Sequence, residues 1–188
     1  MKIIKTPIPG LLILEPRVFA DDRGYFLESY NSQKFENSGI STQFVQDNES
    51  KSSYGVIRGL HYQLEPYSQC KLVRVIQGNV YDVAVDCRKG SPTFGQSFGI
   101  ELSADNKIQF YIPKGFAHGF SVLSETAIFS YKCDSFYHPA ADRGISYNDP
   151  ALGINWGIDS SKAIVSGKDQ LLPLFADAEM NFKFDAHD

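Results

Sequence analysis

Apolar and polar residues alternate with a period of two over much of the chain, and turn residues interrupt this alternation at short intervals. Such alternation is typical of β-strands with one buried face. Many short strands separated by turns favour a sandwich or barrel. The sequence therefore predicts an all-β fold with strands at 11–14, 44–48, 56–62, 72–76, 80–86, 98–102, 109–112, 119–123 and 127–133.

Two turns and one helix complete the predicted elements. The segment Gln77-Gly78-Asn79 is predicted to close a tight hairpin between the strands that flank it. Pro113-Lys114-Gly115 is predicted to separate two further strands. A short helix is expected at 32–38, with Asn31 as its N-cap and Gly39 as its stop.

Length and charge narrow the class of protein. The 188 residues suffice for one well-buried domain, 1–188, in which 150–188 is expected to be mostly loop and short helix packed on the barrel. The net charge of −4 argues against a general binder of nucleic acid or membrane surfaces. A local cluster of Arg and Lys could still hold an anionic ligand.

Cysteine usage and apolar patterning indicate the compartment. No stretch approaches the length of a membrane span, and no long apolar segment stands near the N-terminus. The three cysteines lack any Cys-x-x-Cys spacing, which disfavours structural zinc. Reduced thiols in a cytoplasmic protein are therefore expected.

Four polar residues share strand faces with apolar neighbours: His61, Lys71, His118 and Tyr131. This parity predicts that all four point into the barrel, where polar groups without partners are costly and a ligand cavity is expected. A histidine base, a phenol acid and a lysine cation together suit proton abstraction next to a carbonyl. The alternative is that these residues only pack the strands.

The segments 55–61 and 113–118 resemble the paired motifs of the cupin superfamily, which are jelly-roll β-barrels. Metal-binding cupins place a second His two residues after the first, followed by a Glu. Here Gln63 stands at the second position and no acidic residue stands at the Glu position. Two histidines alone make a poor site for Fe, Mn or Zn. We therefore expect a cupin-type jelly-roll barrel with a few short helices, no metal and no other cofactor.

A series of motifs runs through nearly the whole chain: Leu-Glu-Pro-Arg-Val-Phe at 14–19, Asp-Asp-Arg-Gly at 21–24, Phe-Val-Gln-Asp-Asn at 44–48, Arg-Gly-Leu-His at 58–61, Lys-Leu-Val-Arg-Val at 71–75, Tyr-Asp-Val-Ala-Val-Asp at 81–86, Gly-Ser-Pro-Thr-Phe-Gly at 90–95, Ile-Pro-Lys-Gly-Phe-Ala-His-Gly-Phe at 112–120 and Asn-Asp-Pro-Ala at 148–151. In this order and spacing they resemble one family, the dTDP-4-dehydrorhamnose 3,5-epimerases, which are metal-free cupins of deoxysugar nucleotide synthesis. Any single one of these motifs would be weak evidence for the family.

The resemblance implies an isomerase in dTDP-L-rhamnose biosynthesis. It would epimerise dTDP-4-dehydro-6-deoxy-D-glucose at C3 and C5 to dTDP-4-dehydro-L-rhamnose through an enolate. His61 would be the general base, held in orientation by Asp169. Lys71 would stabilise the enolate oxygen, and Tyr131 would return a proton from the opposite face.

The resemblance also implies the substrate contacts, which would come from Arg23, Glu28, Gln46, Asn48, Arg58, His118, Tyr137, Asp142 and Lys168. Arg23 and Glu28 would belong to an N-terminal segment that reaches the partner's site in a homodimer. Arg58 and Lys168 suit the pyrophosphate. Tyr137 would stack on the thymine ring.

Three positions depart from a simple pattern. Strict alternation points Arg58 away from His61, so we predict a bulge or twist at Gly59 that turns Arg58 into the pocket. Asp142 stands where the family commonly has Glu, so its carboxylate reaches one methylene less far. Cys70 stands where a small residue is usual, and we expect it to pack as a small apolar group.

Other functions remain open from the sequence. One is an epimerase that acts on only one carbon, C3 or C5, of a related nucleotide 4-keto sugar. Another is a metal-dependent cupin oxygenase, which Gln63 disfavours. A sugar-binding cupin without catalysis would be expected to lose the base or the acid, and this chain has both His61 and Tyr131.

Overall fold

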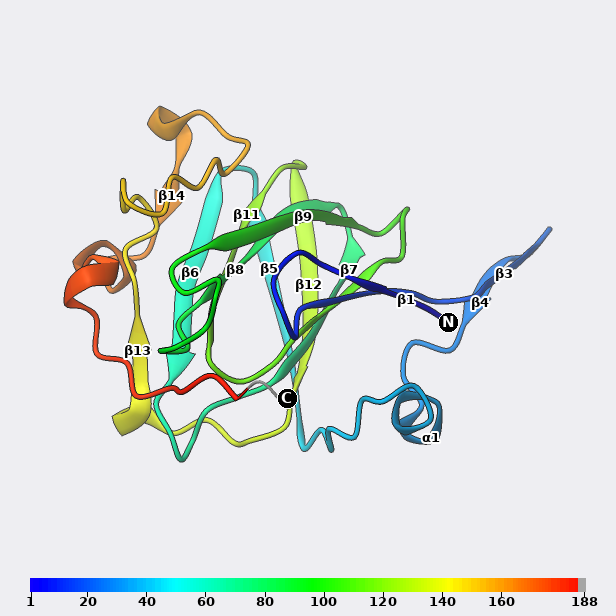
Figure 1. Ribbon diagram of the computed structural model, residues 1–188. Helices are drawn as coiled ribbons and strands as arrows, with labels where there is room; N and C mark the ends of the chain where they lie inside the picture. The colour runs from blue at the N-terminus through cyan, green and yellow to red at the C-terminus, as the bar shows by residue number, and fades with distance from the viewer. Residues whose placement is uncertain (186–188) are drawn as a thin grey trace.

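The computed structural model describes residues 1–185, which form two six-stranded β-sheets that face each other (Figure 1). The first sheet has the order β1 (Lys2–Lys5), β2 (Leu12–Glu15), β10 (Gln109–Ile112), β7 (Lys71–Gln77), β12 (Thr126–Cys133) and β5 (Gln46–Ser53). The second has the order β13 (Asp142–Gly144), β6 (Val56–Gln63), β11 (Phe116–Val122), β8 (Asn79–Asp86) and β9 (Ser97–Ser103), with β14 (Ile164–Val165) beside β6. The predicted all-β jelly-roll architecture is confirmed.

The remaining elements lie outside these two sheets. A hairpin of β3 (Val18–Asp21) and β4 (Gly24–Leu27) projects away from the body of the molecule (Figure 1). One α-helix, α1 (Ser32–Glu36), follows it. The short 3₁₀ helices of the described residues are η1 (Pro139–Ala141), η2 (Ser160–Lys162), η3 (Asp169–Leu171) and η4 (Phe175–Asp177).

Helix α1 begins where the sequence predicts. The side chain of Asn31 accepts a hydrogen bond of 3.1 Å from the backbone N–H of Lys34, as an N-cap does. The regular helix ends at Glu36, earlier than predicted, and the chain continues in tight turns to Gly39, which has a φ of +87°. Gly39 therefore ends the turn and not the helix itself.

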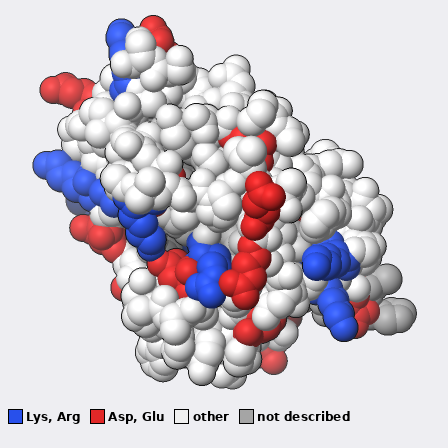
Figure 2. Space-filling model, turned by 90° about the vertical axis from the view of Figure 1, so that its left-hand side faces the viewer, with Lys and Arg blue, Asp and Glu red and all other residues white. Residues whose placement is uncertain are grey.

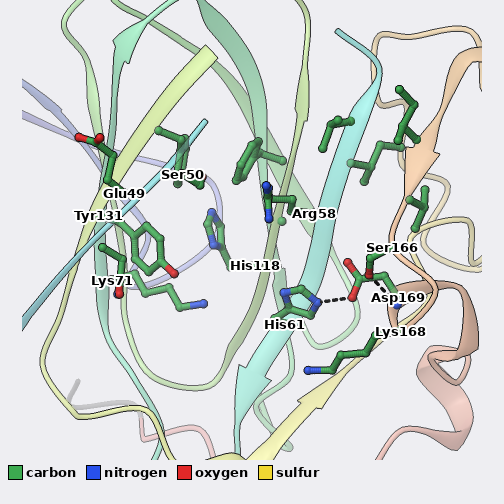
Figure 3. A pocket seen from close by; sticks show the side chains of 18 residues that line it. Glu49, Ser50, Arg58, His61, Lys71, His118, Tyr131, Ser166, Lys168 and Asp169 are labelled. Carbon is green, nitrogen blue, oxygen red and sulfur yellow. Dashed lines mark hydrogen bonds and ion pairs between the residues drawn. The ribbon is translucent and has the colours of Figure 1, made fainter. Parts of the chain in front are cut away.

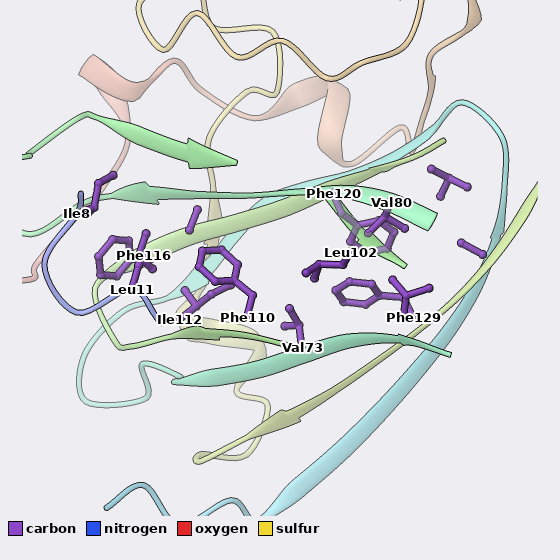
Figure 4. Close-up of a cluster of buried hydrophobic side chains, with 14 residues drawn as sticks. Ile8, Leu11, Val73, Val80, Leu102, Phe110, Ile112, Phe116, Phe120 and Phe129 are labelled. Carbon is purple, nitrogen blue, oxygen red and sulfur yellow. The ribbon is translucent and has the colours of Figure 1, made fainter. Parts of the chain in front are cut away.

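An apolar core fills the space between the two sheets (Figure 4). Phe110 on β10 and Phe129 on β12 are both buried. Both strands belong to the first sheet, where β7 lies between them. Burial of each such ring contributes roughly 1.5–3 kcal/mol. A second cluster covers the outer face of the second sheet, where Trp156 and Phe182 of the C-terminal segment pack near Leu60. Strand β6 is thus covered on both faces.

The predicted hairpin at 77–79 is wrong. Strand β7 lies in the first sheet and β8 in the second, so the chain crosses between sheets at this point. Only Gly78 separates the two strands, whereas the shortest common hairpin loops have two residues. Gly78 has a φ of +75°, and a Cβ there would lie 2.1 Å from the backbone oxygen of Thr126. The crossing therefore requires glycine.

Several strand limits also differ from prediction. Strand β5 extends to Ser53, whereas the prediction ended at residue 48. Its second half is polar and shows no apolar alternation, and it is a strand because its backbone pairs with β12. Strand β11 begins at Phe116 and is buried throughout, which hides its start. The sequence analysis also missed β1, β3, β4, β13 and β14, which have two to four residues each.

A β-bulge interrupts β6 at Gly59. His118 pairs with His61 and Phe120 pairs with Arg58, so one residue of β11 faces two of β6. The extra residue reverses the alternation, and Arg58 and His61 line the same cavity. The predicted bulge is confirmed. Gly59 has a φ of +123°, and a Cβ there would lie 2.5 Å from the Cα of Gly119.

The bulge leads to a prediction about stability. Gly59→Ala places a methyl group against backbone atoms at a positive φ, so the free energy of unfolding should fall by about 2–3 kcal/mol in urea denaturation. Gly167→Ala is the matched control, because a Cβ there meets nothing within 4 Å. Its effect should stay within about 0.5 kcal/mol. Equal stability of the two variants would contradict this account of the bulge.

Candidate active site

A cavity of about 590 Å³ opens between the two sheets, within the size range usual for small-molecule sites. His61 and His118 reach it from the second sheet (Figure 3). Lys71 and Tyr131 reach it from the first. The four strand residues that were predicted to point inward therefore share one cavity, which supports the parity argument.

His61 and Asp169 form a hydrogen-bonded pair in the cavity wall. The distance from His61 Nε2 to Asp169 Oδ1 is 2.7 Å, and Asp169 Oδ2 accepts a 3.3 Å hydrogen bond from the backbone N–H of Gly59. Burial opposes ionisation of Asp169, but the hydrogen bonds from His61 and Gly59 bring its pKa below the usual value. The ionised carboxylate orients the imidazole, so that Nδ1 is free to take a proton.

The C-terminal segment brings Asp169 to the cavity. Strand β14 pairs in parallel with β6, with Ile164 beside Val56. Asp169 follows at the start of η3, where its backbone N–H donates to Ser166 Oγ at 3.1 Å. The pairing with His61 thus spans 108 positions of sequence.

Lys71 supplies a cation without a direct partner. Within residues 1–185, no hydrogen bond or ion pair involves its Nζ. Burial lowers the pKa of Lys71, while the nearby Cys133 and Asp82 act to raise it. A cation in such a cavity is available to an anionic oxygen of a ligand.

Tyr131 enters the cavity from the sheet opposite His61 (Figure 3). Burial raises the pKa of its phenol, with a further rise from Cys133 and an opposing effect of Arg58. The phenol is therefore protonated near neutral pH and can serve as a proton donor. Its ring packs against Phe129, with centroids 6.0 Å apart.

A second carboxylate–imidazole pair, Asp82 and His118, lies deeper in the fold. Nε2 of His118 is 3.0 Å from each carboxylate oxygen of Asp82. Asp82 is fully buried and His118 is 7% exposed. The sequence analysis gave Asp82 no role. The sequence signal that could have found it is an acidic residue between Val80 and Ala84 on one face of a mainly apolar strand.

The predicted substrate-binding residues divide into three groups. Four line the cavity: Asn48, Arg58, His118 and Lys168. Arg58 is oriented there by a 3.1 Å hydrogen bond from its Nε to Ser52 Oγ. The other five do not line it.

Three of these five lie next to the cavity, bonded to each other or to lining residues. Gln46 Nε2 donates to Asn48 Oδ1 at 3.0 Å, and the backbone N–H of Tyr137 donates to Gln46 Oε1 at 3.2 Å. Asp142 accepts hydrogen bonds from the Tyr137 hydroxyl, at 3.2 Å, and from Lys168. The shorter Asp142 is thus held between two predicted ligand contacts.

The last two, Arg23 and Glu28, do not approach the cavity of their own chain. Arg23 lies in the turn of the projecting β3–β4 hairpin, with a side chain that is 89% exposed and paired with Asp21 at 2.6 Å. Glu28 pairs with Lys34, also at 2.6 Å. A single chain therefore does not bring all the predicted substrate-binding residues to one cavity.

Gln63, at the position of a cupin metal ligand, is held by the loop between β6 and β7 and by the loop that follows β12. Its Nε2 donates to the backbone oxygen of Tyr67 at 2.6 Å, and its Oε1 accepts from the backbone N–H of His138 at 2.6 Å. Within the described residues, no group of three His, Cys, Asp or Glu side chains is placed to hold a metal ion.

Cys70 packs away from the cavity that His61 and Tyr131 line. It lines a separate cavity with Thr42 and Tyr111 and is 3% exposed, as expected for a small apolar group. Burial raises the pKa of its thiol to about 12. Cys70 is therefore a weak nucleophile despite standing next to Lys71.

The outer surface carries charges of both signs. Figure 2 shows acidic and basic side chains interspersed on one face, without an extended patch of one sign. In residues 1–185, no helix combines the length and the apolar character that a membrane crossing needs.

Comparisons with known proteins connect this geometry to a family. A family model described as dTDP-4-dehydrorhamnose 3,5-epimerase matches residues 5–177. The protein of that name from Shigella flexneri is 54% identical over 180 residues, which are 95% of this chain and 98% of the relative.

Solved structures agree. The dTDP-4-dehydrorhamnose 3,5-epimerase of Elizabethkingia anophelis NUHP1 is 56% identical, with a TM-score of 0.90 over 94% of this chain and 97% of that chain. The dTDP-6-deoxy-D-glucose-3,5-epimerase of Legionella pneumophila Philadelphia 1, in complex with dTDP-4-keto-L-rhamnose, is 48% identical, with a TM-score of 0.94 over 98% and 99%.

Proposed function

This chain belongs to the dTDP-4-dehydrorhamnose 3,5-epimerase family, and we propose that its cavity inverts C3 and C5 of dTDP-4-dehydro-6-deoxy-D-glucose. The product is dTDP-4-dehydro-L-rhamnose. One observation carries the proposal: His61 and Tyr131 reach a single cavity from opposite sheets. Lys71 lines the same cavity, and its Nζ has no hydrogen-bond or ion-pair partner within residues 1–185. A sugar ring between the two sheets would meet a base on one face and an acid on the other.

The first step removes a proton next to the C4 ketone. Nδ1 of His61 takes the proton, and the electron pair of the broken C–H bond moves to the C4 oxygen. The Lys71 ammonium stabilises that oxygen, and one such donor is typically worth about 3–4 kcal/mol in the transition state. Asp169 stabilises the imidazolium that forms.

The second step returns a proton from the other face. The Tyr131 hydroxyl donates its proton to the enolate carbon, a C–H bond forms and the centre is inverted. The nearby Arg58 stabilises the phenolate, in line with its lowering effect on the Tyr131 pKa. The His61 side chain is 33% exposed to solvent. His61 and Tyr131 can therefore return to their starting protonation states by proton exchange with water before the second carbon reacts.

Residues in and beside the cavity hold the nucleotide. Arg58 and Lys168 carry the positive charges that a pyrophosphate requires. Tyr137 is 55% exposed beside Gln46 and offers its ring to the thymine. Asp142 keeps Tyr137 and Lys168 in place through its two hydrogen bonds and does not itself have to reach the ligand.

The active form is a homodimer in the cytoplasm. The β3–β4 hairpin exposes Phe19, Tyr25 and Phe26 at 49%, 59% and 68%, and such an apolar surface is usually covered by a partner. In the dimer, Arg23 and Glu28 complete the nucleotide site of the partner chain. All three cysteines are free and buried, in line with a reducing compartment.

The reaction in D2O, followed by NMR, tests the function. The wild-type protein should introduce deuterium at both C3 and C5, with inversion at each. His61→Ala should slow exchange at both carbons by about 10²–10⁴-fold, because the base is lost. Exchange at one carbon alone would instead indicate an epimerase acting on a single centre.

Tyr131→Phe separates the two roles in the same experiment. His61 can still remove a proton and return deuterium to the same face, so exchange should continue while inversion is lost. Dissociation constants for dTDP serve as the control, and both variants should bind it like the wild type. Equal loss of exchange and inversion in Tyr131→Phe would refute its role as the acid.

Mixing two impaired variants tests the dimer. If Arg23 serves the partner's cavity, heterodimers of Arg23→Ala and His61→Ala contain one intact site. Random reassociation should then restore about a quarter of the wild-type activity. The control mixes His61→Ala with Tyr131→Phe, which lie in the same cavity, and should restore nothing. No gain from the first mixture would place Arg23 outside the partner's site.

A further inference from the structure

Asp82 is a buried carboxylate in a strand interior that would ordinarily hold an apolar residue. It is fully buried on β8, between Val80 and Ala84 on the same face, and both of these belong to the core between the sheets. Removing a carboxylate from water destabilises the fold unless its partners compensate. What surrounds Asp82 therefore indicates why it is there.

The partners of Asp82 are groups of the catalytic cavity. Both of its oxygens lie 3.0 Å from Nε2 of His118. Its charge also acts on Lys71, against the burial that lowers the pKa of that ammonium. Both His118 and Lys71 line the catalytic cavity.

The other fully buried carboxylate of β8 is bound differently. Asp86 accepts hydrogen bonds from the side chains of Arg88, Ser91 and Thr93 and from the backbone N–H of Arg88. Arg88 in turn donates to the backbone oxygen of Pro9, so this network ties loops together. None of these residues lines the catalytic cavity. Asp86 therefore provides a structural reference for Asp82.

Building on the proposed function, we propose that Asp82 is a positioning residue for the epimerisation. It fixes the orientation of His118 and keeps Lys71 charged, so that both groups face the C4 oxygen side of the sugar in a reactive state. Asp82 touches neither substrate nor reacting atoms and acts only through these two neighbours.

The tautomer of His118 follows from this arrangement. Burial raises the pKa of the Asp82 carboxyl, while His118 and Lys71 act to lower it and so favour the carboxylate. The carboxylate accepts a hydrogen bond from Nε2–H of His118, and the Nδ1 of the neutral ring then presents a lone pair to the cavity. Burial lowers the pKa of His118, which favours the neutral ring, and Lys71 and His61 act in the same direction while Asp82 opposes them. Nδ1 can then accept a hydrogen bond from a sugar hydroxyl or from the Lys71 ammonium.

Several titratable groups surround Lys71 and enter its pH dependence. His61, His118 and Tyr131 line the same cavity. Asp82 on β8, Asp142 on β13, Cys133 on β12 and the adjacent Cys70 act on the pKa of Lys71. Each acts to raise the pKa of Lys71, but the two thiols are themselves neutral near pH 7, because burial raises their pKa to about 11 for Cys133 and about 12 for Cys70. Of the two carboxylates that raise the pKa of Lys71, Asp82 is the fully buried one.

The test replaces Asp82 with its neutral isostere. In Asp82→Asn, the pKa of Lys71 loses a raising influence and falls, so the alkaline limb of the kcat profile should move to lower pH by about one unit. At neutral pH, kcat should fall roughly 10–100-fold, with the KM changed less than threefold, because the nucleotide contacts remain. Asp86→Asn is the matched control, which should lower the melting temperature and leave the pH profile unchanged.

A second readout needs no variant of Asp82. The chain has four histidines, so ¹⁵N NMR of histidine-labelled protein can assign His118 with the help of His118→Gln. The wild-type ring should be protonated at Nε2 and not at Nδ1. A protonated Nδ1, or an alkaline limb of Asp82→Asn that coincides with that of the wild type, would overturn the proposal. Absence of any epimerisation by the wild type would instead contradict the proposed function, and the NMR result would stand independently.

Discussion

The 2.7 Å hydrogen bond between His61 and Asp169 is the contact on which the site depends. It joins a central strand of the second sheet to the C-terminal segment, and the backbone N–H of Gly59 holds the other oxygen of the same carboxylate. The bulge at Gly59 therefore has two effects: it turns Arg58 and His61 to one side of β6, and it supplies a donor that orients Asp169. The bulge thus sets both the direction of the Arg58 and His61 side chains and the orientation of the carboxylate that holds His61.

The sandwich architecture explains why the chemistry is an inversion. A base and an acid on the same strand could approach only one side of a ring, whereas His61 and Tyr131 stand on sheets that face each other. Apolar side chains fill one part of the space between the sheets, and polar side chains line the cavity in the other part. These polar residues lower the folding stability of the free protein. Binding compensates, because an anionic oxygen of the substrate pairs with Lys71.

Strand parity was enough to predict that four polar residues share one cavity. His61, Lys71, His118 and Tyr131 were predicted to point inward from alternation alone, and the bulge at Gly59 followed from the conflict between Arg58 and that alternation. The resemblance to a family was needed for Asp169, because no local pattern links residues 108 positions apart. Pairing partners were not predictable in the same way: the segment at 77–79 looked like a hairpin, yet its two strands belong to different sheets. Asp82 was missed because a buried acid in an apolar strand reveals its partner only in three dimensions.

The central claim is that the base and the acid stand on opposite faces of one sugar ring. The most direct test is a crystal structure of the protein with dTDP-glucose, which lacks the C4 ketone and cannot be epimerised. The account predicts His61 Nδ1 and the Tyr131 hydroxyl on opposite sides of the hexose, each within about 3.5 Å of C3 or C5. A hexose bound with both groups on one side, or outside the gap between the sheets, would contradict it.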